Sequence, residues 1–155
     1  MRKTTFLLLP LLLFTALLSC STAPSHHAAV IQEKHDWHGI AIAEIQAEYP
    51  IFEEQYHPLN AAIEAEVAQW RAQYDMICAI AEEDCNRDAD LATFHRYLTA
   101  TYTVARHGNE ISVTFDVRRD ADPSNSEEAY TKTLTLDTAS GMVYQTVTQT
   151  SRIYQ

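Results

Sequence analysis

Histidines and paired carboxylates are the side chains of this chain whose types and spacing could do chemistry. His35 and His38 lie three residues apart with Asp36 between them, and His26-His27 lies nearby. A zinc site needs about four ligands that converge, and only a fold-back of the His26-His27 segment could supply the missing ones. The sequence therefore predicts no metal site and no bound cofactor.

Adjacent carboxylates occur three times, as Glu53-Glu54, Glu82-Glu83 and Glu127-Glu128. Glycoside hydrolysis needs two carboxylates that face each other across a cleft, which neighbours in sequence do not provide. Gly-x-Ser-x-Gly, phosphate-loop and His-Glu-x-x-His patterns are missing. Three glycines are too few for a glycine-built nucleotide cradle. We predict that the protein is not an enzyme; a small metal-dependent hydrolase is the least favoured alternative.

Cys20 closes a segment with the layout of an export signal. Arg2 and Lys3 precede an apolar run over 6–18, and residues 17–20 read Leu-Leu-Ser-Cys. This end resembles the lipobox of bacterial lipoproteins, in which the cysteine thiol receives a diacylglycerol. The resemblance implies a signal peptide over 1–19 and lipidation of Cys20.

Two other interpretations of this segment are weaker. The 13 apolar residues would span about 20 Å as a helix, whereas a bilayer core needs about 30 Å. An ordinary secretory signal cut near Ser19 would leave Cys20 unmodified. Ser21 follows the cysteine instead of Asp, which resembles lipoproteins sorted to the outer membrane of enteric-type bacteria. We expect an envelope protein anchored by several acyl chains, at the outer membrane where there is one.

The charge balance excludes one class of partner. Loss of Arg2 and Lys3 with the signal leaves 9 of 11 basic residues against 21 acidic ones, a net charge of −12 with neutral histidines. Such a chain will not bind nucleic acid by neutralising phosphates. It can attract a basic protein or a cation, although solubility at a crowded surface is the favoured explanation of the charge.

Cys78 and Cys85 form an even pair in an exported chain, which favours a disulfide. In one continuous helix their Cα atoms would lie about 10.5 Å apart, and bridging requires less than about 7 Å. The predicted bond therefore requires the helix to end between them, near Glu82-Glu83-Asp84. Two free thiols are the alternative.

The first elements are a tether, a strand and a helix. Residues 20–35 are small and polar and predict a flexible tether, so that a single domain covers 36–155. Apolar residues over 40–49 alternate in two phases, which indicates a bulge or two short strands ending at Pro50. Pro58 then opens an amphipathic helix. Its apolar stripe is Leu59, Ile63, Val67, Trp70, Tyr74 and Ile77, and Glu64, Glu66, Gln69, Arg71 and Asp75 lie off it.

From residue 92 the period changes to two, with a hairpin signal at His107-Gly108-Asn109. The sequence predicts an α+β fold with one amphipathic helix packed on an antiparallel sheet of about four to five strands. One helix covers only one face of such a sheet. The other face carries a row of threonines, which we interpret either as a solvated face or as a flat binding or dimer surface. These are Thr99, Thr101, Thr103, Thr114, Thr131, Thr133 and Thr135, with Ser112 beside them.

Short motifs over residues 38–147 resemble a family of extracytoplasmic bacterial domains of unknown function. They are the segment 48–52 (Glu-Tyr-Pro-Ile-Phe), the segment 59–63 (Leu-Asn-Ala-Ala-Ile), the strand 111–115 and the turn from Asp137 to Gly141. The family includes N-terminal regions of peptidoglycan deacetylases and the sensor domain of a lysozyme-responsive anti-sigma factor. Related sensor domains carry Gly-Ala-His between their last strands, where this chain has 120–125, Asp-Ala-Asp-Pro-Ser-Asn.

The resemblance implies a non-catalytic module that binds a protein or a wall polymer, and no role tied to Gly-Ala-His carries over. Lysozyme is one specific candidate partner, because it is strongly basic and this domain is strongly acidic. The alternative is a structural or assembly lipoprotein that self-associates through the threonine face or a strand edge.

Overall fold

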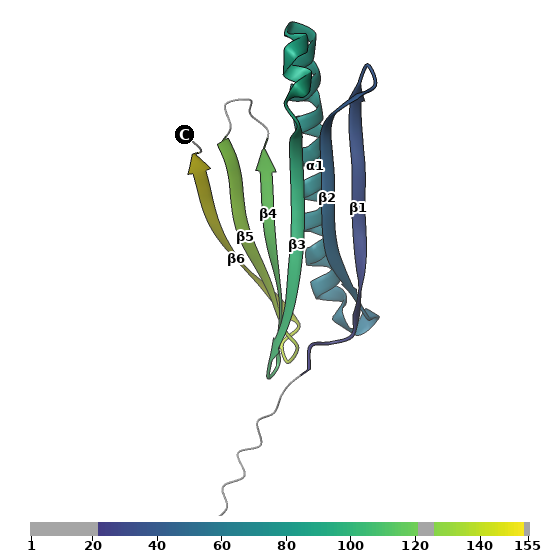
Figure 1. The fold of residues 1–155 in the computed structure, drawn as a ribbon. Helices are drawn as coiled ribbons and strands as arrows, with labels where there is room; N and C mark the ends of the chain where they lie inside the picture. Colours follow the sequence, from purple (N-terminus) through teal and green to yellow (C-terminus); the bar gives the residue numbers. More distant parts are fainter. Residues whose placement is uncertain (1–21, 121–125, 154–155) are drawn as a thin grey trace, which may run out of the picture.

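The computed structural model describes residues 22–120 and 126–153, which form six strands and one long helix (Figure 1). Two short 3₁₀ turns, Glu54–Tyr56 and Ala89–Thr93, precede and follow the helix. The expected signal peptide and Cys20 lie outside the described residues. The strands are β1 (His26–Trp37), β2 (Ile40–Phe52), β3 (Arg96–His107), β4 (Glu110–Asp120), β5 (Ser126–Asp137) and β6 (Met142–Ile153), and the helix is α1 (His57–Arg87).

The strands form a single sheet in chain order, β1-β2-β3-β4-β5-β6. Neighbours are antiparallel except β2 and β3, which run parallel over five residue pairs from Ala43–Arg96 to Ala47–Ala100. A parallel connection needs a crossover, and α1 provides it. The α+β class is confirmed, whereas the prediction of four to five purely antiparallel strands is wrong: the sheet has six strands and is mixed.

The predicted tether over 20–35 is also wrong for most of its length. Residues from His26 onward form β1, which pairs with β2 from His26–Phe52 to Trp37–Ile40. β1 is an edge strand in which Ile31 alone is buried. Its sequence therefore shows too little alternation to be recognised as a strand.

The two-phase pattern of β2 comes from a bulge, one of the two predicted alternatives. His35 pairs with Ala43 and Asp36 with Ala41, so Ile42 is the extra residue. The strand also continues through Pro50 to Phe52. Proline is tolerated there because the β3 ladder ends at Ala47, leaving no bond on that side for the missing N–H.

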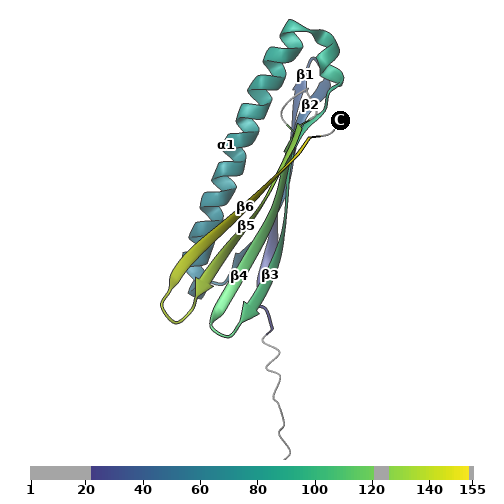
Figure 2. The ribbon, with the colours of Figure 1, turned by 90° about the vertical axis from the view of Figure 1, so that its left-hand side faces the viewer.

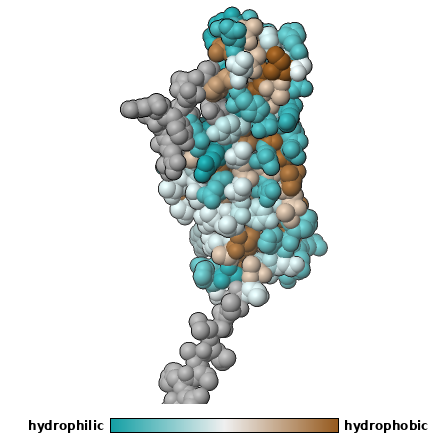
Figure 3. All heavy atoms as spheres, viewed as in Figure 1, coloured by the Kyte–Doolittle hydropathy of each residue, from teal (hydrophilic) through white to brown (hydrophobic). Residues whose placement is uncertain are grey.

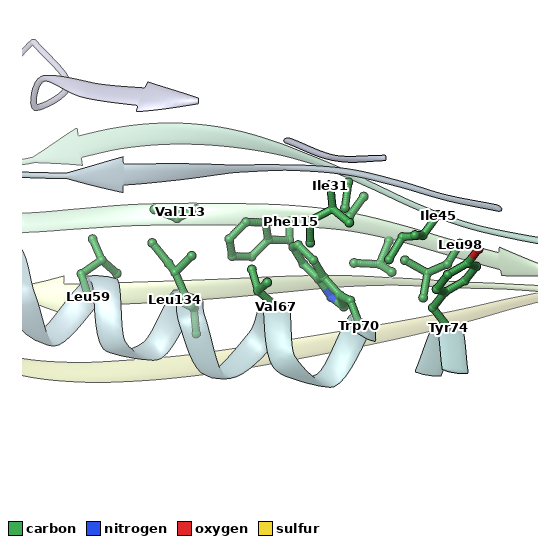
Figure 4. Close-up of a cluster of buried hydrophobic side chains, with 14 of the residues drawn as sticks. Ile31, Ile45, Leu59, Val67, Trp70, Tyr74, Leu98, Val113, Phe115 and Leu134 are labelled. Atoms are coloured by element: carbon green, nitrogen blue, oxygen red, sulfur yellow. The ribbon is translucent and has the colours of Figure 1, made fainter. Parts of the chain in front are cut away.

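α1 lies along one face of the sheet and buries its predicted stripe against it (Figure 2). All six stripe residues are buried, as predicted. Figure 4 shows four of them, Leu59, Val67, Trp70 and Tyr74, facing side chains of the sheet. Trp70 meets Phe115 of β4 edge to face, with ring centroids 5.2 Å apart. The buried core lies between Ile31 and Leu136, so a chain of residues 21–155 contains the described folded unit.

The predicted Cys78–Cys85 disulfide is not formed. α1 runs without interruption from His57 to Arg87, and both cysteines are free. Asp84, in the segment where a break was expected, instead accepts a bond of 2.7 Å from the fully buried Arg96 of β3. This ion pair fixes the last turns of α1 to the sheet, and the helix consequently continues past both cysteines.

Candidate functional site

The face of the sheet opposite α1 carries the predicted threonines, which we call the threonine face: Thr99, Thr101, Thr103, Thr114, Thr131, Thr133 and Thr135. Register places Thr103, Thr114 and Thr133 in one cross-strand row and Thr101, Asp116 and Thr131 in the next. The residues between them in β4, such as Val113 and Phe115, are buried toward α1. Figure 3 shows this face as mainly hydrophilic to neutral.

Hydroxyl pairs hold part of this face in a fixed arrangement. Thr114 Oγ1 lies 3.0 Å from Thr133 Oγ1, and Ser112 Oγ lies 2.9 Å from Thr135 Oγ1. One row further, Thr131 Oγ1 donates to a carboxylate oxygen of Asp116 at 2.8 Å. The side-chain hydroxyls on β4 and β5 are therefore held in fixed orientations, and a ligand that binds there contacts an ordered polar surface.

A hollow of about 520 Å³ opens on the threonine face at the end where β4 stops and β5 starts. Its volume lies within the range of small-molecule sites, about 300–1,000 Å³. Its lining mixes hydroxyl, carboxylate and guanidinium groups. The lining residues are Thr99, Thr101, Asp116, Val117, Arg118, Glu127, Ala129, Tyr130 and Thr131.

Glu127 and Arg118 give this hollow its chemical character. The Glu127 side chain is only 12% exposed and accepts a bond of 2.9 Å from the Tyr97 hydroxyl. The Arg118 guanidinium lies 3.9 Å from the other Glu127 oxygen and is largely exposed. Donors and acceptors thus stand side by side in a polar depression, an arrangement that matches a ligand with many hydroxyl groups.

Sequence reasoning missed a second polar cluster, on the helix side of the sheet. Glu66, which lies off the predicted apolar stripe, is only 1% exposed. One of its carboxylate oxygens accepts from Trp70 Nε1 at 3.0 Å and from the Tyr130 hydroxyl at 3.1 Å. The other oxygen accepts from Lys132 Nζ at 2.5 Å. The available signal was Lys132 itself, a charged residue in the apolar row of β5, because a buried ammonium requires an acidic partner.

This cluster lies beside a smaller groove of about 260 Å³ between α1 and the β5–β6 edge. Burial, reinforced by the charge of Glu66, raises the pKa of Tyr130 to about 12. The hydroxyl therefore stays protonated and donates to Glu66 at neutral pH. Because these hydrogen bonds join groups within the protein, we interpret the cluster as a structural contact that holds α1 against β5.

The candidate metal residues do not come together. His35 contacts Glu82 at 2.9 Å and His95 contacts Glu44 at 3.1 Å. In residues 22–120 and 126–153, no three His, Cys, Asp or Glu side chains gather as a metal ion would require. Within the same ranges, every helix is too short or too polar to cross a bilayer.

The motif behind the family resemblance has a structural explanation. Asn60 Oδ1 accepts from the Phe52 amide at 3.0 Å, and Asn60 Nδ2 donates to the Phe52 carbonyl at 2.9 Å. The side chain thereby joins the first turn of α1 to the end of β2. No protein-family model matches the chain, and comparison with curated proteins gives no significant match. The function is therefore inferred from the site itself.

Proposed function

We propose that this chain is a non-catalytic binding module of the bacterial cell envelope, anchored by a lipid on Cys20, that binds a wall polymer or a protein on its threonine face. The observation that carries the proposal is the polar hollow at Asp116, Arg118 and Glu127, on the face that α1 leaves uncovered. The lipobox-like sequence ending at Cys20 supports the location.

The chemistry of the hollow favours a glycan. A sugar presents closely spaced hydroxyls, each both donor and acceptor, and the carboxylates, hydroxyls and guanidinium of this hollow complement both roles. The ordered hydroxyl pairs on β4 and β5 limit the entropy lost when a ligand binds. A wall polymer is therefore the first candidate ligand.

A basic protein such as lysozyme is the second candidate. It is favoured by the net charge of −12 that the 21 acidic residues give the chain without its signal. Attraction of this kind speeds association and weakens as salt is added. It does not by itself select the threonine face.

Calorimetric titration of residues 21–155 distinguishes these ligands. Soluble peptidoglycan fragments and lysozyme are titrated separately, each at low and moderate salt. Saturable glycan binding that is insensitive to salt supports the first candidate, and stoichiometric lysozyme binding that persists at moderate salt supports the second. Absence of saturable binding to both contradicts the proposal.

A further inference from the structure

The two edges of the sheet differ in how they are protected. β1 and β6 each pair with one neighbouring strand in the described part of the chain, so each leaves a row of backbone groups open to pairing. Native proteins usually protect such edges with charged side chains, bulges or short strands. β1 carries the charged residues Glu33, Lys34 and Asp36, and the bulge at Ile42 of β2 interrupts its pairing register.

β6 lacks this protection over most of its length, and its one charged residue, Arg152, stands next to its end. Residues 142–151, Met-Val-Tyr-Gln-Thr-Val-Thr-Gln-Thr-Ser, contain no charge, proline or glycine. Met142, Tyr144 and Val147 are 56%, 53% and 55% exposed. A long, neutral edge strand with exposed apolar side chains is a template for another strand.

We propose that β6 pairs antiparallel with β6 of a second copy of this chain, joining the two sheets edge to edge. The sequence of β6 can pair with itself in the register centred on Gln145. In that register Val143 faces Val147 of the other copy, Tyr144 faces Thr146, and Gln145 faces its own equivalent. The valines then meet each other, the glutamine amides meet each other and the Tyr144 ring lies against a threonine. Each pair recurs on both sides of the axis, as an isologous two-fold contact requires.

The uncharged sequence of this edge adds no local repulsion to such a contact. Without its signal the chain carries 9 basic against 21 acidic residues, a net charge of −12, so two copies repel each other over most orientations. At residues 142–151 no like charges face each other. Because an antiparallel two-fold contact places both α1 helices on one side of the joined sheet, the two threonine faces become continuous on the other. The pairing stands independently of what the threonine face binds.

Sedimentation velocity of residues 21–155 over a concentration series tests the pairing. The wild-type chain is expected to shift from monomer to dimer as concentration rises. Val147→Lys on β6 should abolish the dimer, whereas Val30→Lys on β1, a matched exposed valine (58%) on the other edge, should leave it intact. Unfolding curves establish that both variants are folded.

A charge-swap pair tests the register. Gln145→Lys alone and Gln145→Glu alone should each be monomeric, because each places like charges opposite one another. Mixing the two should restore a dimer containing one copy of each. A wild-type monomer at all concentrations, equal disruption by Val30→Lys, or failure of the mixture to associate would overturn the proposal. A monomer that instead binds an uncharged extended peptide would overturn it too and assign the edge to another protein.

Discussion

Glu66 of α1 and Lys132 of β5 form an ion pair beneath the helix, with Nζ 2.5 Å from Oε2 and the two side chains 1% and 11% exposed. Removing one member leaves the other charge buried without its partner. We predict that Glu66→Gln or Lys132→Met lowers the free energy of unfolding by about 3–5 kcal/mol, measured by urea denaturation.

The double variant Glu66→Gln with Lys132→Met provides the control. The amide oxygen introduced by Glu66→Gln would still accept from Trp70 and Tyr130, and no uncompensated charge would remain. Most of the lost stability should therefore return. Additive losses in the double variant would show that the charges are not coupled.

Tyr130 should make the stability of the fold depend on pH in the alkaline range. Its pKa is raised from 10.0 to about 12 in the folded protein, mainly by burial. Between these values the folded state holds the phenolic proton more tightly than the unfolded state does, so this contribution to stability is complete below pH 10 and is lost as pH rises toward 12. Tyr130→Phe should flatten stability across that window in urea denaturation at successive pH values. An unchanged slope would contradict the assignment.

Asn60 should stabilise the start of α1 through its two bonds to the Phe52 backbone. Asn60→Ala removes both, and we expect a loss of about 1–3 kcal/mol in the free energy of unfolding. Asn60→Asp keeps the acceptor for the Phe52 amide but sets a carboxylate against the Phe52 carbonyl, so it should also destabilise. If both variants unfold like the wild type, the Asn60 side chain does not stabilise the connection between β2 and α1.

The cysteines should behave as free thiols of unequal reactivity. Cys85 is buried and therefore inaccessible to reagents in the native state. Burial raises the pKa of the half-buried Cys78 thiol, so this thiol is not readily ionised. A thiol-reactive probe should label Cys78 slowly and Cys85 only after unfolding. Reductant should leave the thermal midpoint unchanged; a lowered midpoint would indicate a disulfide.

Local sequence patterns predict the helix and the strands in which buried residues recur with a regular period. The stripe from Leu59 to Ile77 repeats with the helical period, and β4 alternates with period two. The hairpin signal at His107-Gly108-Asn109 is confirmed by the pairing of His107 with Glu110 and by Gly108 at φ 58°. These features depend on neighbours in sequence.

The remaining features depend on contacts between distant segments. β1 buries only Ile31, and the parallel pairing of β2 with β3 is created by the path of α1. The threonine face could be predicted because its members alternate with apolar residues. Its hollow could not, because Asp116 and Glu127 come from different strands and meet only through the β4–β5 register.

The most direct test of the threonine face compares two arginine substitutions in the same binding titration. Thr101→Arg puts a long side chain at the hollow, and Ala72→Arg puts the same side chain on the exposed surface of α1. Both change the net charge equally, so a general electrostatic effect is common to them. With the ligand identified by calorimetry, Thr101→Arg should abolish binding while Ala72→Arg retains it. Equal affinities for the two variants would contradict binding at the threonine face.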